Sequence, residues 1–226
     1  IWDAQPPAPI GAIRPHGVEF AGKSSQDKRH QVAADLTDAG QTSVVLTMPD
    51  SIAWLLNIRG SDISRMPVAL SFAVLTADGR ATLFTDPAKA DASVLDHLGP
   101  DVALQDWTAF GPALDALKGP VRVDKASAPL WVSNRLAAAR IATVYAPDPC
   151  ALPKARKNLV EIEGARAAHL RDGVAMAELL AWLDALGPAP DLSEIDVVTK
   201  LEALRTASNL LVDISFETIC GTGPNG

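Results

Sequence analysis

Histidine is a common metal ligand, and the spacings of the four histidines in this sequence do not form a recognised site. The histidines are widely separated and are His16, His30, His97 and His169. No two of them stand at zinc-ligand spacing, and no H-E-x-x-H motif occurs. His169 and Asp172 are three positions apart on a predicted helix and could face one site. A solvated polar helix face is the favoured interpretation of this pair.

No serine, cysteine or carboxylate stands in the setting of a catalytic group. The sequence lacks the G-x-S-x-G motif that presents a serine nucleophile. Cys150 and Cys220 have no histidine or basic neighbourhood that would activate a thiol. Their wide separation favours reduced, buried thiols over a disulfide, and we expect a cytoplasmic protein. Glu161 and Glu163 lie two positions apart on a predicted helix, so they point in different directions.

The last glycines match a nucleotide-binding pattern in spacing only. Gly221, Gly223 and Gly226 fit G-x-G-x-x-G after a segment predicted to be extended. The fingerprint also requires a βαβ unit, a helix that opens at the glycines and an acidic residue about 20 positions later. Two predicted helices precede the segment, which argues against a βαβ unit. A turn that needs glycine is therefore favoured, and a nucleotide-binding α/β domain is kept as an alternative.

Composition and charge describe a globular chain and exclude two classes of partner. Hydrophobic residues make up 48% of the sequence and charged residues 21%, which is typical of a folded protein. The net charge of −7 disfavours binding to a phosphate backbone. No apolar run reaches the ~18 residues that a membrane span needs. We expect no nucleic-acid partner and no membrane association.

The elements that must position these residues alternate between strands and helices. Predicted helices cover residues 24–39, 51–57, 87–98, 107–117 and 129–139, and predicted strands cover 43–48, 68–76, 81–85, 101–105, 121–124 and 141–145. Asp78-Gly79 predicts a hairpin whose two central residues both have positive φ. The pattern predicts an α/β fold, a mixed β-sheet with flanking helices.

A second part of different character follows a proline-rich stretch at residues 146–153. A long helix is predicted over 154–186, with an apolar stripe formed by Met176, Leu179, Leu180 and Leu183. Ser193 opens a further helix whose predicted inner face is Ile195, Val198 and Leu201. We therefore expect a linker at 1–22, a middle domain at 23–150 and the start of another domain at 151–226.

The two ends of the sequence predict an internal piece of a longer protein. The first residue is Ile1 rather than Met, and the proline-rich start is typical of an extended linker. Residues 221–226 form a turn-rich loop that we expect to lead onward. Part of the function is then expected to depend on residues outside this sequence.

Several stretches are similar, in order and approximate spacing, to one known family. They are Ile1-Trp2 with Pro6, residues 50–63, the set Lys157-Asn158, Glu161, Gly164, 168–169, 171–175 and Trp182-Leu183, then 192–194, 215–219 and Gly223-Pro224. In these motifs the sequence resembles the three-domain Xaa-Pro aminopeptidases of the creatinase and methionine aminopeptidase superfamily. His169, Arg171 and Asp172 look diagnostic of that family, with a structural role in securing the helix.

The resemblance implies a fold and an activity. It implies a middle domain of the creatinase N-terminal type, followed by the first helices of an incomplete pita-bread α+β domain. The family removes the N-terminal residue of peptides with proline in second position, using two divalent metal ions, commonly manganese, and a bridging water. Its ligands are two Asp, one His and two Glu beyond the Gly-Pro loop. The resemblance therefore implies no catalytic or metal-binding residue in this chain, and we expect the chain alone to be inactive.

Peptides that begin Xaa-Pro are the expected substrates, and we expect the full-length protein to be a homodimer. One residue is a candidate for substrate binding. Arg59 follows an apolar segment on a short loop, from which its guanidinium could reach the substrate mouth, as middle-domain loops sometimes do in this family. The favoured alternative is a structural arginine that binds carbonyls or pairs with Asp62. A metal-free scaffold or chaperone module remains the alternative for the function.

Overall fold

The computed structural model describes residues 3–187 and 191–226. Ile1-Trp2, part of the stretch compared above, lies outside the described residues. The chain divides into two compact units, Ile1–Asn158 (unit 1) and Leu159–Gly226 (unit 2). Each unit is considered by itself.

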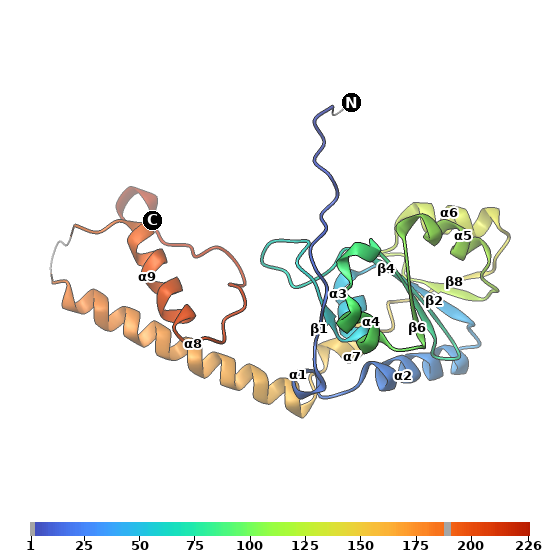
Figure 1. Ribbon diagram of the computed structural model, residues 1–226, viewed down its shortest axis with the longest axis horizontal. Helices are drawn as coiled ribbons and strands as arrows, with labels where there is room; N and C mark the ends of the chain where they lie inside the picture. Colours follow the sequence, from blue (N-terminus) through green and yellow to red (C-terminus); the bar gives the residue numbers. More distant parts are fainter. Residues whose placement is uncertain (1–2, 188–190) are drawn as a thin grey trace. The chain divides into compact units, whose positions relative to one another are not determined.

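Unit 1 is built on a mixed sheet of six strands in the order β6-β5-β4-β2-β7-β8 (Figure 1). The strands are β2 (Ser43–Leu46), β4 (Phe72–Thr76), β5 (Ala81–Phe84), β6 (Val102–Gln105), β7 (Val121–Val123) and β8 (Thr143–Tyr145). β2 pairs antiparallel with β4 and parallel with β7. β4 and β5 are antiparallel, whereas β5–β6 and β7–β8 are parallel pairs. The predicted mixed α/β fold is confirmed.

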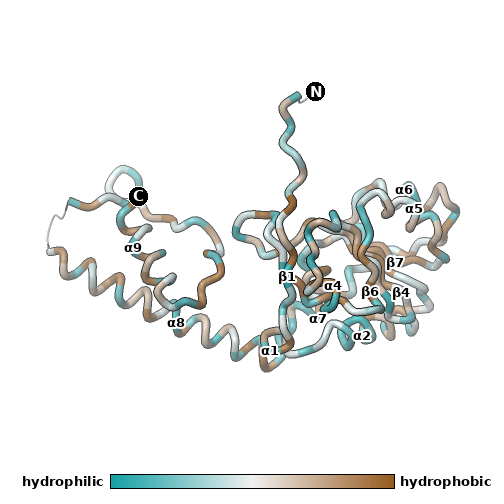
Figure 2. The backbone as a smooth tube through the Cα atoms, viewed as in Figure 1, coloured by the Kyte–Doolittle hydropathy of each residue, from teal (hydrophilic) through white to brown (hydrophobic). Residues whose placement is uncertain are grey.

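Helices cover both faces of this sheet, because successive strand residues point to opposite sides. Val44 and Leu46 of β2 pack into one hydrophobic cluster and Val45 into the other. The first cluster receives α2 (Ser25–Asp38), α3 (Pro49–Leu56) and α4 (Ala92–Leu98). The second receives α5 (Phe110–Asp115) and α6 (Leu130–Ala138). Figure 2 shows the apolar strands between these layers.

Two short elements join the entry segment to the core of unit 1. β1 (Arg14–Pro15) pairs antiparallel with β3 (Ile58–Arg59) as a separate two-stranded sheet. The short helix α1 (Val18–Ala21) follows β1. The backbone N–H of Ile13 donates to Lys89 O at 2.8 Å, so the segment before β1 is hydrogen-bonded to the rest of unit 1 as well.

Local capping explains where three predicted helices are wrong. The predicted helix over 87–98 is split into η1 (Pro87–Lys89) and α4, because Asp86 and Asp91 each cap a separate start. The helix over 107–117 is split into η2 (Trp107–Ala109), which Asp106 caps, and α5, which begins at Phe110. The helix over 154–186 is split into α7 (Ala151–Ala155) and α8 (Leu159–Ala185), since Arg156 is extended with ψ 94°.

The hairpin at Asp78-Gly79 exists, but its predicted turn is wrong. Only Gly79 has positive φ, at 84°. Thr76 N donates to Arg80 O at 2.9 Å, so three residues form the loop instead of two. A three-residue loop with glycine in the left-handed position is the next most common hairpin connection.

Unit 2 contains α8, α9 (Glu194–Thr206) and η3 (Gly223–Asn225). Ser193 caps α9 in a reciprocal capping box with Asp196. The predicted inner face of α9 is wrong in part, because Leu201 is buried whereas Ile195 is 72% exposed. On α8 only Ala175 and Leu179 are buried, while Met176 and Leu180 of the predicted stripe are exposed. Residues 210–219 are irregular and form no strand in this described stretch.

Candidate functional site

Arg59, the candidate for substrate binding, lies in β3 just beyond the end of α3. The helix ends at Leu56, and its C-cap residue Asn57 adopts the left-handed conformation with φ 50°. Arg59 Nη1 donates to Ile58 O at 2.8 Å and to Ala53 O at 3.4 Å. The guanidinium therefore meets carbonyls at the negative end of the α3 dipole.

Lys28 of α2 brings a second cation to the same helix end. It is 2% exposed, and its Nζ donates to Asn57 Oδ1 at 2.7 Å and to Trp54 O at 3.0 Å. Nζ also lies 4.6 Å from the centroid of the Trp54 ring. Neutral oxygens and an aromatic face thus contribute to stabilising this buried ammonium.

His16 completes the cluster from the entry segment. Its backbone N–H donates to Asn57 O at 2.8 Å, and its ring stacks on Phe20 with centroids 5.7 Å apart. Burial, followed by the charges of Arg59 and Lys28, lowers the pKa of His16 from 6.5 to about 4. The imidazole is therefore neutral near pH 7. The group around Asn57 therefore combines two cations and a neutral imidazole at the carboxyl end of α3, and it includes no nucleophile.

Asp62, the alternative partner of Arg59 in the sequence, forms a buried ion pair with Lys89. Lys89 Nζ lies 2.6 Å from Asp62 Oδ2, and the two side chains are 2% and 0% exposed. The N–H groups of Leu70 and Gly11 donate to the same carboxylate at 2.7 and 2.9 Å. This network attaches the loop after β3 to the entry segment and to η1.

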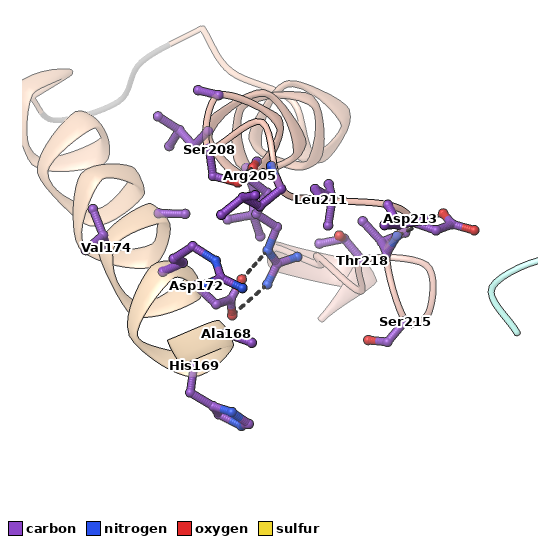
Figure 3. A pocket seen from close by; sticks show the side chains of 18 of the residues that line it. Ala168, His169, Asp172, Val174, Arg205, Ser208, Leu211, Asp213, Ser215 and Thr218 are labelled. Carbon is purple, nitrogen blue, oxygen red and sulfur yellow. Dashed lines mark hydrogen bonds and ion pairs between the residues drawn. The ribbon is translucent and has the colours of Figure 1, made fainter. Parts of the chain in front are cut away.

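Unit 2 holds a pocket of about 950 Å³ between α8, α9 and residues 210–219 (Figure 3). Arg205 Nε and Nη2 approach Asp172 Oδ1 and Oδ2 at 2.6 and 3.2 Å. Most of the remaining lining is apolar, including Val174, Leu211 and Phe216. His169 lines the pocket as well, but its Nδ1 lies 2.8 Å from Ala165 O of its own helix. The structure thus gives Asp172 a fork-like pairing with Arg205 and gives His169 a local helix contact.

The carboxyl ends of β2 and β7 form the place where α/β proteins commonly bind ligands. These adjacent parallel strands are followed by α3 and α6 on opposite faces of the sheet, which defines a crevice. Here the chain crosses that edge itself. Asp148 N donates to Asp124 Oδ2 at 3.1 Å beyond β7, and Lys154 pairs with Asp50 beyond β2. Residues 148–154 therefore span the crevice that a nucleotide would use.

The terminal glycines lack the setting of a dinucleotide loop in the part of the chain that the structure describes. Residues 210–220 form no strand, and the glycines open only the three-residue η3. Gly223 has φ 55°, as a glycine-dependent turn requires. Glu194 Oε1 accepts from Thr222 N at 3.2 Å and Asn225 Nδ2 at 3.0 Å, which ties the turn to α9.

A metal-binding set is not found among residues 3–187 and 191–226. No group of three or more His, Cys, Asp or Glu side chains in these ranges could hold an ion. Cys150 is buried and Cys220 partly buried, and both are free thiols. Burial, followed by the charge of Asp148, raises the pKa of the Cys150 thiol well above its usual value, so it is inert as a nucleophile. In the same ranges, every helix is too short or too polar to cross a bilayer.

Several charged residues of these networks were missed in the sequence. Lys28 stands four positions before Val32 and eight before Leu36, so it lies on the same buried face of α2 as these two apolar residues. That spacing could have predicted a buried lysine from the sequence. Lys89 and Arg205 gave no such signal, because Asp62 and Asp172, with which they pair, lie 27 and 33 positions away.

Comparison with known proteins identifies relatives for both units. The family model for the creatinase/prolidase N-terminal domain matches residues 4–161. A probable Xaa-Pro aminopeptidase P of Coccidioides posadasii (strain C735) is 36% identical over 240 residues, covering 100% of this chain and 36% of the relative. Its counterpart in Leptosphaeria maculans is 36% identical over 237 residues, with 100% and 39% covered. The chain thus spans less than two fifths of the length of these relatives.

Solved structures show the same fold. X-prolyl aminopeptidase from Caenorhabditis elegans, described as a cytosolic enzyme with a di-nuclear active site, superposes with a TM-score of 0.86 at 24% identity. The match covers 97% of this chain and 37% of that one. A prolidase from Thermococcus sibiricus superposes with a TM-score of 0.62 at 17% identity, covering 90% and 55%.

Proposed function

Because the chain belongs to the creatinase/prolidase N-terminal domain family, we propose that it is part of an Xaa-Pro aminopeptidase. In this proposal residues 1–22 are a linker, residues 23–150 form the middle domain and residues 151–226 begin the pita-bread catalytic domain, so the domain change precedes the boundary between the two units at Asn158. The observation that carries the proposal is 36% identity to probable Xaa-Pro aminopeptidases P over the whole chain. The exposed apolar side chains of unit 2 support it, since such a surface suits packing against further polypeptide.

The proposed reaction removes the first residue from peptides with proline in second position. That peptide bond has no N–H and its proline has a fixed φ, so a dedicated site is needed to accommodate it. Two divalent metal ions, manganese in this proposal, would activate water and polarise the scissile carbonyl. The described residues do not fit such a pair of ions, since they include no ligand cluster. We place the ligands in the rest of the longer protein and expect this chain alone to be inactive.

The peptidase proposal is tested by comparing this chain with the complete protein. Both are incubated with manganese and an Xaa-Pro tripeptide, and release of the first residue is measured. Activity of the complete protein alone is expected. Activity of the isolated chain would contradict its proposed inactivity. A complete protein that folds but releases nothing with manganese, cobalt or zinc would support the scaffold alternative.

Arg59 is proposed to contribute to substrate binding in the complete enzyme, at the mouth of its own or a neighbouring subunit. Its place beside Lys28 and neutral His16 supports this role, since the group is cationic. Arg59→Ala should raise KM for an Xaa-Pro peptide with little change in kcat. A KM that stays constant while only the melting temperature falls would leave Arg59 as a cap of α3. The neighbouring-subunit version also requires the proposed cytoplasmic homodimer, which sedimentation of the complete protein would test.

A further inference from the structure

The aromatic side chains of unit 1 form a stack that reaches the surface at Trp131. The rings of Phe72 and Phe110 lie 4.6 Å apart between centroids, and those of Phe110 and Trp131 lie 5.9 Å apart. Phe110 is 3% exposed, whereas Trp131 is 48% exposed. A buried ring therefore supports the indole, which presents about half of its surface.

Arg135, one helical turn after Trp131, is held firmly beside the indole. Its Nε and Nη2 lie 2.9 and 2.7 Å from the two carboxylate oxygens of Asp115, and Nε also donates to Gly111 O at 3.0 Å. The guanidinium carbon is 5.3 Å from the centroid of the Trp131 ring. A Cβ at position 111 would come within 2.8 Å of the guanidinium carbon, so the absence of a side chain at Gly111 leaves space for the guanidinium of Arg135. The pair of Arg135 and Asp115 adds no net charge to this surface.

A pocket of about 590 Å³ lies at this position. It is lined by Asp115, Trp131, Asn134, Arg135, Ala138 and Ala139. The indole of Trp131 supplies an apolar surface, and Ala138 and Ala139 have small side chains. The exposed amide of Asn134 can both donate and accept a hydrogen bond. Because Asp115 neutralises Arg135, the surface favours neither anions nor cations. The matching ligand is neutral, with an apolar ring and hydrogen-bonding carbonyls.

We propose that this pocket binds an uncharged, proline-containing peptide segment in the polyproline II conformation. Such a segment has no internal hydrogen bonds, so its carbonyls are available to Asn134 and the indole N–H. Its pyrrolidine rings pack on exposed aromatic surfaces, which is how aromatic-lined grooves recognise proline-rich peptides. The interaction needs no free amino terminus and no cleavage, so it stands apart from the proposed peptidase activity.

The test uses a blocked peptide, acetyl-Pro-Pro-Ala-Pro-Pro-Ala-amide, which an aminopeptidase cannot process. The matched control replaces each proline with glycine. Binding is followed on the indole N–H resonances of the five tryptophans in proton–nitrogen correlation spectra. Trp131→Phe assigns the relevant resonance and keeps a ring on Phe110. Trp107→Phe is the control, because the Trp107 ring contacts Phe72 at the other end of the stack, with centroids 5.4 Å apart.

The proline peptide should shift the Trp131 resonance with a Kd on the order of 1 mM. The glycine peptide should not shift it. Asn134→Ala, which leaves the indole in place, should weaken binding roughly threefold to tenfold. The proposal fails if Trp131 does not respond at about 10 mM peptide, or if the glycine peptide acts equally. It also fails if the resonance changes only with protein concentration, which would mean that this face pairs with a second copy of the chain.

Discussion

Folding changes the ionisation of His16, which belongs to the group around Asn57. Its pKa falls from 6.5 to about 4, because of burial first and then the charges of Arg59 and Lys28, with Arg14 adding a smaller effect and Glu19 opposing it. The unfolded chain therefore binds a proton at a higher pH than the folded chain does. Stability from neutral His16 is complete above pH 6.5 and is lost as the pH falls toward 4.

The expected loss from this one group is roughly 1–2 kcal/mol, reduced from the full pKa shift because the ring is only half buried. It is measured as the difference between the urea unfolding free energies of the unmodified chain and His16→Gln at pH 7 and pH 4. Because the other titrating groups are common to both chains, the difference isolates His16. A constant difference across this range would contradict the prediction.

Asp62 and Lys89 illustrate a second prediction at the residue scale. Asp62→Asn keeps the shape of the side chain but leaves the Lys89 ammonium, 2% exposed, without its counter-charge. We expect a loss of about 3–5 kcal/mol in the free energy of unfolding. The exposed pair of Asp78 and Arg80, with side chains 51% and 72% exposed, is the control. Asp78→Asn should cost less than about 1 kcal/mol.

A double variant separates the charge effect from loss of packing. Asp62→Asn combined with Lys89→Met removes both charges and should recover a large part of the lost stability. If the two substitutions are simply additive in chemical denaturation, the ion pair does not hold the loop after β3.

At the scale of elements, strands and single helices were predictable because their signals are local. Ser24 accepts from Asp27 N at 3.0 Å, so the start of α2 follows from the capping pattern itself. The order of the six strands was not predictable, since parallel pairing of β2 with β7 joins residues such as Ser43 and Val121. Splits at Ala90 and Arg156 were missed because those residues take an extended backbone inside segments of good helix propensity.

The candidate site shows the same limit. Arg59 could be placed near the end of a helix, but its carbonyl partners and the neighbouring Lys28 depend on how α2 packs against α3. The pair of Asp172 and Arg205 likewise requires α8 and α9 to be side by side. Contacts between residues far apart in the chain do not occur at a fixed spacing, so a single sequence does not predict them.

The β4–β5 hairpin gives a prediction at the element scale. Gly79 has φ 84°, and a Cβ there would come within 2.6 Å of His30 Cδ2. Gly40→Ala is the matched control, since Gly40 has φ 65° and open space around the added carbon. We expect Gly40→Ala to cost about 1 kcal/mol from backbone strain and Gly79→Ala to cost more. Adding His30→Ala to Gly79→Ala should reduce its loss of stability to that of Gly40→Ala. If the two glycine substitutions cost the same without His30→Ala, the contact with His30 is unimportant.

At the scale of the whole molecule, the two units differ in how well they bury apolar side chains. Both hydrophobic clusters belong to unit 1, where Leu36, Leu55, Leu75 and Leu114 are completely buried. In unit 2, Ile219 is 92% exposed and Leu170 on α8 is 73% exposed. Since buried apolar area drives folding, most of the stability should reside in unit 1.

Limited proteolysis and thermal unfolding test this division. Protease should cut unit 2 first and leave a resistant fragment that ends near Asn158. A chain shortened to residues 3–158 should keep the melting temperature of the full chain within about 2 °C, because the contacts that define its core lie inside unit 1. Keeping Asn158 matters, since its Nδ2 donates to Ala21 O at 2.8 Å. A shortened chain that melts much earlier would show that the two units fold as one. A resistant fragment from unit 2 would contradict the expectation that most of the stability resides in unit 1.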